Sequence, residues 1–340
     1  MNIFNKIVVL FISCMVLVSC TPEESNIPPL RDYAEQYAKD IAVIEEYLQT
    51  HYMEVINNPG ATNDQSVTYT LIPEGGTQTS IWNQTQYPLQ TRLVLQNNIV
   101  YKIYYLKLRQ GSGPNSKSPC NVDQVLTSYR GEYIFTSTET INEEEVKTIK
   151  SKQFEESIDA QTYFNLSSLV ARWSEIFPLF KTGSYAANPD GTLSYFDFGA
   201  GVMFLPSALA YYSGSPSSIP SYSPLIFSFK LYEIQRTDQD GDGVYSYQED
   251  ISTSVVNSDG TVTVTNGIPD GYVRVLANGE TNPDDTDGDG TPDFLDIDDD
   301  GDFFTTRIEI RNPLTNNPFA FDLIPTCSDG KKKHLSTLCN

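Results

Sequence analysis

The sequence predicts an α+β fold in which a helix and a hairpin precede a β-rich middle and a loop-rich, aspartate-rich end. Three observations carry this prediction. Leu30 to Thr50 repeats apolar residues at helical spacing, 121–234 is predominantly β in pattern, and hydrophobic periodicity mostly fades beyond Arg236. The chain has 340 residues, 39% of them apolar and 12% aromatic, which is enough to build a core.

The N-terminal helix and hairpin follow from local patterns. Tyr33, Tyr37, Ile41, Ile44 and Leu48 recur at three- and four-residue intervals, which is one face of an amphipathic helix. The later stretch "TRLVLQNNIVYKIYYLKLRQG" alternates around two consecutive asparagines and predicts a β-hairpin.

The charge of the chain is concentrated in one segment. The formal net charge is −22, and 18 of the 44 acidic residues lie between Asp238 and Asp302, where Arg274 is the one basic residue. Nucleic-acid binding needs clustered Lys and Arg, so this balance argues against a nucleic-acid partner. Only 2 His are present, which disfavours zinc sites and triad chemistry.

The first nineteen residues are typical of an export signal. Lys6 precedes an apolar stretch from Ile7 to Val18 that is short for a membrane span. The tetrad "LVSC" resembles the bacterial lipobox, which implies a lipid on Cys20 and a membrane anchor; the alternative is a plain secretory signal. The following "PEES" resembles the acidic export tags of some Bacteroidota lipoproteins. We expect a lipid-anchored protein of the cell envelope, at the outer membrane on its periplasmic face or the cell surface.

Three cysteines then remain in an oxidising compartment. Cys327 and Cys339 flank a short segment near the end, and we expect a disulfide between them. Cys120 would be left as a buried free thiol.

Three stretches in the β-rich middle resemble FKBP-type peptidyl-prolyl cis/trans isomerases. They are "VLTSYRGEY" (125–133), "FEES" through "WSEIFPLFKTG" (154–183) and "MFLPSALAYY" through "LIFSFKLYEI" (203–234). The resemblance implies a half-open antiparallel sheet wrapped around a short helix, with an apolar pocket between them. It also implies isomerase activity on proline-containing exported polypeptides, with no cofactor for catalysis. The pocket residues that it implies are Tyr129, Phe154, Glu155, Val170, Trp173, Tyr211, Ile219 and Phe227.

The chain departs from the family pattern in several places. Glu155 stands where the family has Asp, and Arg172 stands where Gly precedes the tryptophan. Insertions follow Tyr133, where a loop near the pocket is expected to cover or extend it, and Gly183. Any one of the aromatic residues, taken alone, is also compatible with an ordinary core.

The aspartate-rich end contains three loops of EF-hand type, in which alternating oxygens on a glycine-turned loop suit Ca²⁺. Their tandem overlap resembles thrombospondin type 3 repeats, and the alternative is a solvated acidic linker. The first loop supplies Asp238, Asp240, Asp242, Val244, Ser246 and Glu249; the second supplies Asp285, Asp287, Asp289, Thr291, Asp293 and Asp296. The third supplies Asp298, Asp300, Asp302, Phe304, Thr306 and Glu309, with Phe303 in place of Gly. The calcium ions would be structural.

These interpretations divide the chain into five segments: 1–19 signal peptide; 20–115 tether, helix and hairpin; 116–236 FKBP-type domain; 237–310 calcium-binding repeats; 311–340 tail. Two functions remain open at this point. One is a prolyl isomerase that assists the folding of exported proteins; the other is a non-catalytic binding or adhesion module with a calcium-stiffened spacer.

Overall fold

The computed structural model describes residues 29–339 except 142, 170–171, 215, 217, 251, 258–260 and 267–281. Residues from Asp32 onward form one compact unit, and those up to Arg31 belong to a second. Within the described residues, no helix is both long enough and apolar enough to cross a membrane. The predicted signal and Cys20 lie outside the described residues.

The predicted N-terminal helix is confirmed as α2 (Tyr33–Thr50). Asp32 caps it, because its carboxylate accepts hydrogen bonds from the backbone N–H groups of Ala34 and Glu35 at 2.9 and 3.0 Å. One side of the helix is buried, and that side includes polar Gln36 and Asp40 beside its apolar residues.

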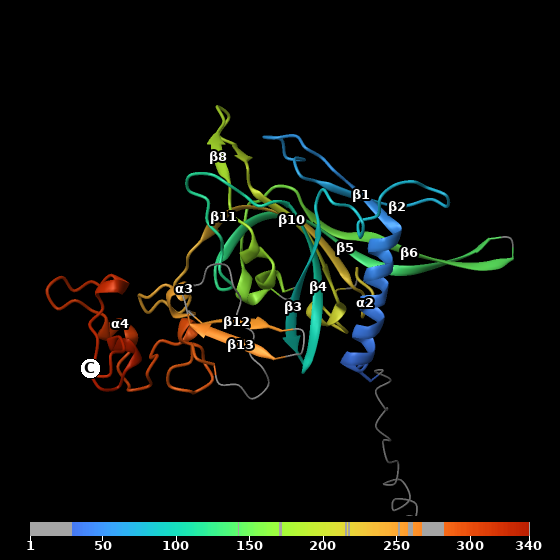
Figure 1. Ribbon diagram of the computed structural model, residues 1–340. Coiled ribbons are helices and arrows are strands. Elements are labelled where there is room, and N and C mark those ends of the chain that lie inside the picture. Colours follow the sequence, from blue (N-terminus) through green and yellow to red (C-terminus); the bar gives the residue numbers. More distant parts are fainter. Residues whose placement is uncertain are drawn as a thin grey trace, which may run out of the picture. The chain divides into compact units, whose positions relative to one another are not determined.

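The central sheet has seven strands, in the order β3-β4-β10-β11-β5-β6, with β7 paired to β5 (Figure 1). Every pairing in it is antiparallel. Its strands are β3 (Leu89–Gln96), β4 (Ile99–Arg109), β5 (Gln124–Ile141), β6 (Glu144–Ser157), β7 (Tyr163–Asn165), β10 (Gly199–Leu205) and β11 (Leu225–Gln235).

The predicted hairpin is confirmed as β3 and β4, and the sheet extends it in an unexpected way. Asn97 and Asn98 form the turn with φ angles of 52° and 59°, the left-handed pair that a tight hairpin turn requires. β4 then pairs with β10, so the sheet runs across the predicted boundary at residue 115.

Side chains alternate between two buried faces of the sheet. On β11, Phe227, Phe229 and Leu231 pack with Trp173 in one core. On the intervening positions, Ile226 and Tyr232 belong to a second core that contains residues of α2. Apolar residues on both faces of β11 are therefore buried, while Ser228 and Lys230 interrupt the apolar residues on the second face.

The insertion after Tyr133 does not form a loop over the pocket. It continues β5 and β6 as a long hairpin, in register from Tyr133↔Lys152 to Ile141↔Glu144. This arm runs out beyond the other strands in Figure 1. The expectation that it would cover the pocket is wrong because strand pairing satisfies its backbone groups away from the aromatic core.

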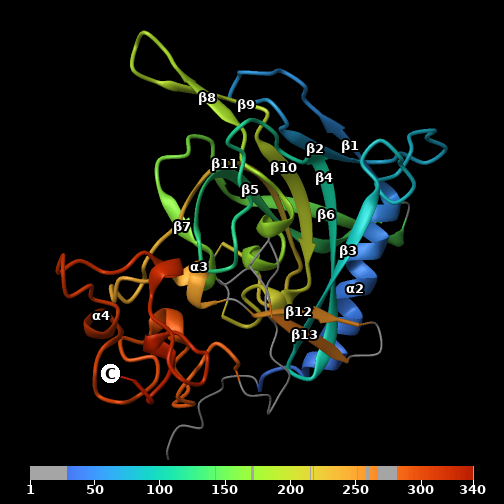
Figure 2. The same ribbon diagram turned by 60° about the vertical axis from the view of Figure 1, so that its left-hand side comes forward.

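Smaller elements complete the fold. Two-stranded sheets join β1 (His51–Val55) to β2 (Val67–Leu71), β8 (Ser184–Ala187) to β9 (Leu193–Phe196), and β12 (Ser252–Val256) to β13 (Val262–Asn266). The 3₁₀ helices are Leu166–Ser168, Trp173–Glu175, Phe177–Leu179, Ser207–Leu209, Asp293–Leu295, Phe321–Leu323 and Lys333–Leu335. The short α3 (Ser246–Glu249) and α4 (Thr306–Glu309) lie among the C-terminal loops (Figure 2).

Three of the cysteines take the predicted states. Cys327 and Cys339 are joined in a disulfide with their Cα atoms 5.7 Å apart, and Cys120 is a buried free thiol. Burial raises the pKa of the Cys120 thiol, and the adjacent Asp123 carboxylate raises it further.

Candidate functional site

Four of the aromatic residues implied by the resemblance lie together on one face of the sheet. Trp173 contacts Tyr129 and Phe227 edge to face, with ring centroids 4.9 and 5.3 Å apart. Phe154 contacts Phe227 in the same manner at 5.8 Å. Such T-shaped contacts are the geometry that aromatic quadrupoles favour.

The strand register explains how residues distant in sequence meet here. Gly131 on β5 pairs with Phe227 on β11 and with Glu155 on β6. A Cβ on Gly131 would lie 2.5 Å from the Phe154 ring, so the glycine leaves the space that this ring fills. The glycine of the "YRGEY" motif therefore shapes the site because it has no side chain.

The base of the site is closed and its rim is partly exposed. Trp173, Ile219 and Phe227 are only 4, 4 and 3% exposed. Tyr129, Phe154 and Tyr211 are half-buried around them, and Glu155 is exposed. Val170, the remaining residue of the implied pocket, lies outside the described residues.

Two tyrosine hydroxyls and one carboxylate supply the polar groups of the rim. Burial raises the pKa of Tyr129, and the neighbouring Glu155 carboxylate raises it further. The same two causes, in the same order, raise the pKa of Tyr211. Both hydroxyls therefore stay protonated at neutral pH and can donate hydrogen bonds to a bound carbonyl.

The residue before the tryptophan has a backbone conformation that favours glycine. Arg172 has a φ of 47°, in the left-handed region. Its guanidinium donates hydrogen bonds to the side-chain oxygen of Gln96, at 3.0 Å from Nε. This contact ties the 3₁₀ helix of Trp173 to the β3–β4 turn.

The three acidic loops share one backbone pattern, although they differ in sequence. Their twelve positions are counted from Asp238, Asp285 and Asp298. In each loop the carboxylate at position one accepts the N–H of position six, at 3.1, 3.1 and 3.0 Å from Asp238, Asp285 and Asp298. In each loop the carboxylate at position five accepts the N–H of position seven, at 2.7, 2.7 and 2.8 Å. The third loop thus closes like the others although it lacks the glycine.

Phe303 takes the backbone conformation of that glycine. Its φ is 76°, against 109° and 99° for Gly243 and Gly290 at the same position. The Phe303 side chain is 95% exposed, so no packing offsets the strain of a left-handed conformation.

Carboxylates at positions one, three and five come together in every loop. Oxygens within 4.8 Å of one another are offered by Asp238, Asp240 and Asp242, by Asp285, Asp287 and Asp289, and by Asp298, Asp300 and Asp302. Two unit charges about 4 Å apart repel by about 4 kcal/mol at an effective dielectric of 20. The clusters therefore need protons or cations.

Buried oxygens without hydrogen-bond partners identify where a cation fits. Both carboxylate oxygens of Glu249 and Glu309, the position-twelve residues of the first and third loops, are buried and unpartnered. Burial, followed by the charge of Asp242, raises the pKa of Glu249 to about 11. A hard divalent cation with oxygen ligands would satisfy these groups.

The position-nine side chains face the loop backbone. Ser246, Asp293 and Thr306 each accept the N–H of position two, at 3.0, 2.7 and 3.4 Å. The Asp293 carboxylate is also hydrogen-bonded to the hydroxyl of Thr286 at 2.8 Å. These residues hold the loops in shape, and positions one, three, five, seven and twelve remain as candidate ligands.

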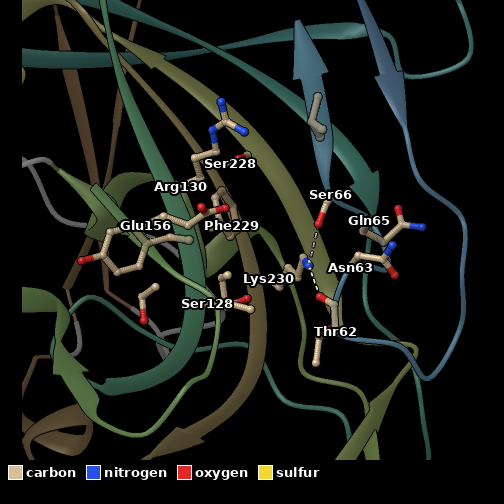
Figure 3. A pocket seen from close by; sticks show the side chains of 14 residues that line it. Thr62, Asn63, Gln65, Ser66, Ser128, Arg130, Glu156, Ser228, Phe229 and Lys230 are labelled. Carbon is tan, nitrogen blue, oxygen red and sulfur yellow. Dashed lines mark hydrogen bonds between the residues drawn. The ribbon is translucent and has the colours of Figure 1, made fainter. Parts of the chain in front are cut away.

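A polar pocket of about 230 Å³ is lined by residues of β5, β6 and β11 and of the segment that leads into β2 (Figure 3). Lys230 points into it and donates hydrogen bonds to the Thr62 carbonyl at 2.6 Å and the Ser66 hydroxyl at 3.0 Å. Burial lowers the pKa of Lys230 to about 8. Sequence analysis missed this pocket, although the polar positions of "SYR" and "FSFK" alternate with the aromatic ones.

Comparisons with known proteins give one family match and a set of similar solved structures. The family model described as BamM C-terminal matches residues 239–334, which contain all of the acidic loops except Asp238. No curated protein matches the chain.

Solved structures similar to this one cover 39 to 47% of its length. A peptidyl-prolyl cis-trans isomerase from Pseudomonas syringae pv. tomato is 20% identical over 44% of this chain and 81% of its own, with a TM-score of 0.28. FkpA from Escherichia coli is 19% identical over 39% and 48%, with a TM-score of 0.23. A multi-domain immunophilin from Arabidopsis thaliana is 15% identical over 47% and 50%, with a TM-score of 0.28. Similarities at this level do not assign an activity.

Proposed function

We propose that this protein is a peptidyl-prolyl cis/trans isomerase that acts on exported polypeptides. One observation carries the proposal: Trp173, Tyr129, Phe154 and Phe227 meet as an aromatic site beneath two tyrosine hydroxyls. The proposal agrees with the FKBP-like sequence motifs, which supply these same residues in the same order.

The chemistry needs no acid, base or cofactor. Rotation about a prolyl amide must overcome a barrier of about 18–20 kcal/mol because resonance keeps the bond planar. Resonance weakens when the carbonyl loses its water shell, which an aromatic surface excludes. A hydroxyl of Tyr129 or Tyr211 at the rim would orient the carbonyl while the proline ring rests on the aromatic base.

A turnover assay on a proline-containing peptide tests this proposal with the full chain in calcium. Trp173→Leu and Tyr211→Phe should lower the catalysed rate at least several-fold. Tyr185→Phe is the matched control, since Tyr185 is 60% exposed on β8, and it should leave the rate unchanged. Wild-type protein that accelerates isomerisation no more than buffer contradicts the proposal.

The buried base of the site favours a second candidate, a non-catalytic binding module. With Trp173 and Phe227 almost fully covered, peptide would contact mainly the rim residues. This candidate predicts that a proline-containing peptide quenches tryptophan fluorescence on binding without any acceleration of isomerisation.

We further propose that the acidic loops bind Ca²⁺ and that the ions stabilise the C-terminal segment. The unpartnered buried oxygens of Glu249 and Glu309 support this role. Chelation should raise protease sensitivity within 237–310 and leave the central sheet intact, because coordination supplies folding free energy that a small apolar core cannot. Asp285→Ala with Asp287→Ala should weaken the calcium effect. Identical proteolysis with and without chelator contradicts the proposal.

We also propose that Cys20 carries a lipid that anchors the chain at the outer membrane. The proposal is supported by the "LVSC" motif after an apolar stretch. Cys20→Ser should abolish acylation and release the protein from the membrane fraction, because the anchor depends on its acyl chains. Retained acylation would contradict the assignment.

A further inference from the structure

One buried carboxylate of the aspartate run lies outside the ligand positions of its own loop. Asp299 is position two of the third loop, between Asp298 and Asp300, so it points away from the cation site that those two form. Its counterparts in the first and second loops, Gln239 and Thr286, are not acidic. The repeating ligand positions of the loops therefore do not explain an acidic residue at position two.

The structure brings Asp299 against the first loop. Carboxylate oxygens of Asp242, Glu249 and Asp299 all lie within 4.8 Å of one another, and all three residues are buried. Asp242 is position five and Glu249 position twelve of the first loop. Three acids from two loops that are at least fifty residues apart in the sequence thus face one point.

Two of these carboxylates, Glu249 and Asp299, have no hydrogen-bond partner, and Asp242 keeps one unpartnered oxygen beside the one that accepts the Val244 N–H. Asp299 is 1% exposed and Glu249 is 5% exposed, and neither carboxylate has a hydrogen-bond partner on either oxygen. None of the ion pairs among the described residues includes any of the three acids. Buried charges without a partner are costly, so such a group points to a cation.

The surrounding contacts hold the two loops in this arrangement. Val244 of the first loop packs with Ile310, directly after α4, in a small core. Arg307 of α4 donates a hydrogen bond to the Gly241 carbonyl at 2.6 Å. The three acids are therefore presented by loops that already contact each other.

We propose that Asp242, Glu249 and Asp299 bind a divalent cation that links the first acidic loop to the third. Three carboxylates in a flexible loop setting suit Ca²⁺ better than Mg²⁺, which requires a tighter octahedron and keeps its water. The inference rests on the calcium loops proposed above and adds a site that no single loop contains. The ion adds a link through carboxylate ligands between two loops that already contact each other.

Calcium binding by the full chain tests the site, with Asp299→Asn compared to wild type. Native mass spectrometry should find one fewer calcium ion on the variant, or titration should show one site weakened at least tenfold. Asp322→Asn is the matched control, because Asp322 is exposed and belongs to no acidic group. Unchanged stoichiometry and affinity in Asp299→Asn would overturn the proposal.

Thermal unfolding with and without calcium distinguishes whether Asp299 is a calcium ligand or only supports the fold. In chelator, Asp299→Asn should melt no lower than wild type, since it removes one of three mutually repelling acids. In calcium it should gain a smaller increase of the melting temperature than wild type gains. A melting temperature lowered equally in both conditions contradicts the site. Wild-type protein that binds no calcium would refute the loop proposal as well, whereas the isomerase assay is independent of this outcome.

Discussion

The link between α2 and the turn that carries Tyr211 gives the sharpest test of how the site is built. Asp40 of α2 is 2% exposed and lies against the 3₁₀ helix Ser207–Leu209. One of its carboxylate oxygens accepts the backbone N–H and the hydroxyl of Ser207 at 2.7 and 2.6 Å. The other accepts the side-chain amide of Gln36 at 2.6 Å.

Asp40→Ala would leave these donors without their acceptor. Gln36 keeps its hydrogen bond to the Tyr222 carbonyl at 3.4 Å, and the Ser207 hydroxyl can rotate. The buried Ser207 N–H cannot move without moving the turn, and an unsatisfied buried donor costs about 1–3 kcal/mol. With the lost charge-assisted bonds included, we expect a destabilisation of about 3 kcal/mol. At an unfolding entropy of about 2.1 cal/mol/K per residue, this corresponds to a thermal midpoint lowered by roughly 5 °C for the unit from Asp32 onward.

Asp40→Asn is the control, because an amide oxygen can still accept from Ser207 while Gln36 reverses its own amide. It should cost about 1 kcal/mol or less. Thermal unfolding and prolyl-peptide turnover are measured on both variants in calcium. Asp40→Ala should lower both, since the displaced turn carries Tyr211. A midpoint within 2 °C of wild type for Asp40→Ala would refute the reasoning.

Three further predictions concern single positions. Phe303→Gly should stabilise the calcium-loaded protein by about 1 kcal/mol, because it relieves a left-handed residue whose side chain packs against nothing; a lower thermal midpoint would contradict this. Gly131→Ala should displace the Phe154 ring and cost about 1–3 kcal/mol by overpacking; adding Phe154→Leu should recover part of the loss, and no recovery would exclude the ring clash as its cause. Burial lowers the pKa of His51 to about 4 from an ordinary value of 6.5. At pH values between 4 and 6.5 the unfolded chain therefore binds a proton that the folded chain does not bind. The free energy of unfolding should fall by up to about 3 kcal/mol as the pH drops from 6.5 to 4. His51→Gln should flatten that dependence in urea titrations, and an unchanged slope would exclude His51 as its source.

Sequence patterns predicted the elements that depend on neighbouring residues. They did not predict the pairing of strands that are distant in the sequence. The helical spacing from Tyr33 to Leu48 and the Asn97-Asn98 turn depend on neighbours within a few residues, so both predictions are confirmed. The pairing of β4 with β10 depends on register between segments about 90 residues apart, and no local signal marks it. The hairpin after Tyr133 was mistaken for a loop because its charged strands bury little.

In the acidic C-terminal segment, too, local patterns could be predicted from the sequence and contacts between distant residues could not. Loop positions one, three and five could be counted from Asp238, Asp285 and Asp298, because glycine turns and alternating oxygens repeat along the chain. Asp299 could not be distinguished from its neighbours by counting, since its significance comes from Glu249, fifty residues earlier.

The same contacts suggest why the helix and the sheet belong to one functional unit. The 3₁₀ helix before Tyr211 is held from α2 by Asp40, and the 3₁₀ helix of Trp173 is held from the β3–β4 turn by Arg172. The N-terminal partners of these two contacts, Asp40 and Gln96, lie before residue 116, where the FKBP-like motifs have not yet begun. A fragment that starts at 116 would keep every implied pocket residue and lose both anchors, together with two strands of the central sheet. The rim and base of the aromatic site would then lose their fixed positions even if the remaining strands paired. The segment before residue 116 is therefore part of the site's structural support rather than a tether to it.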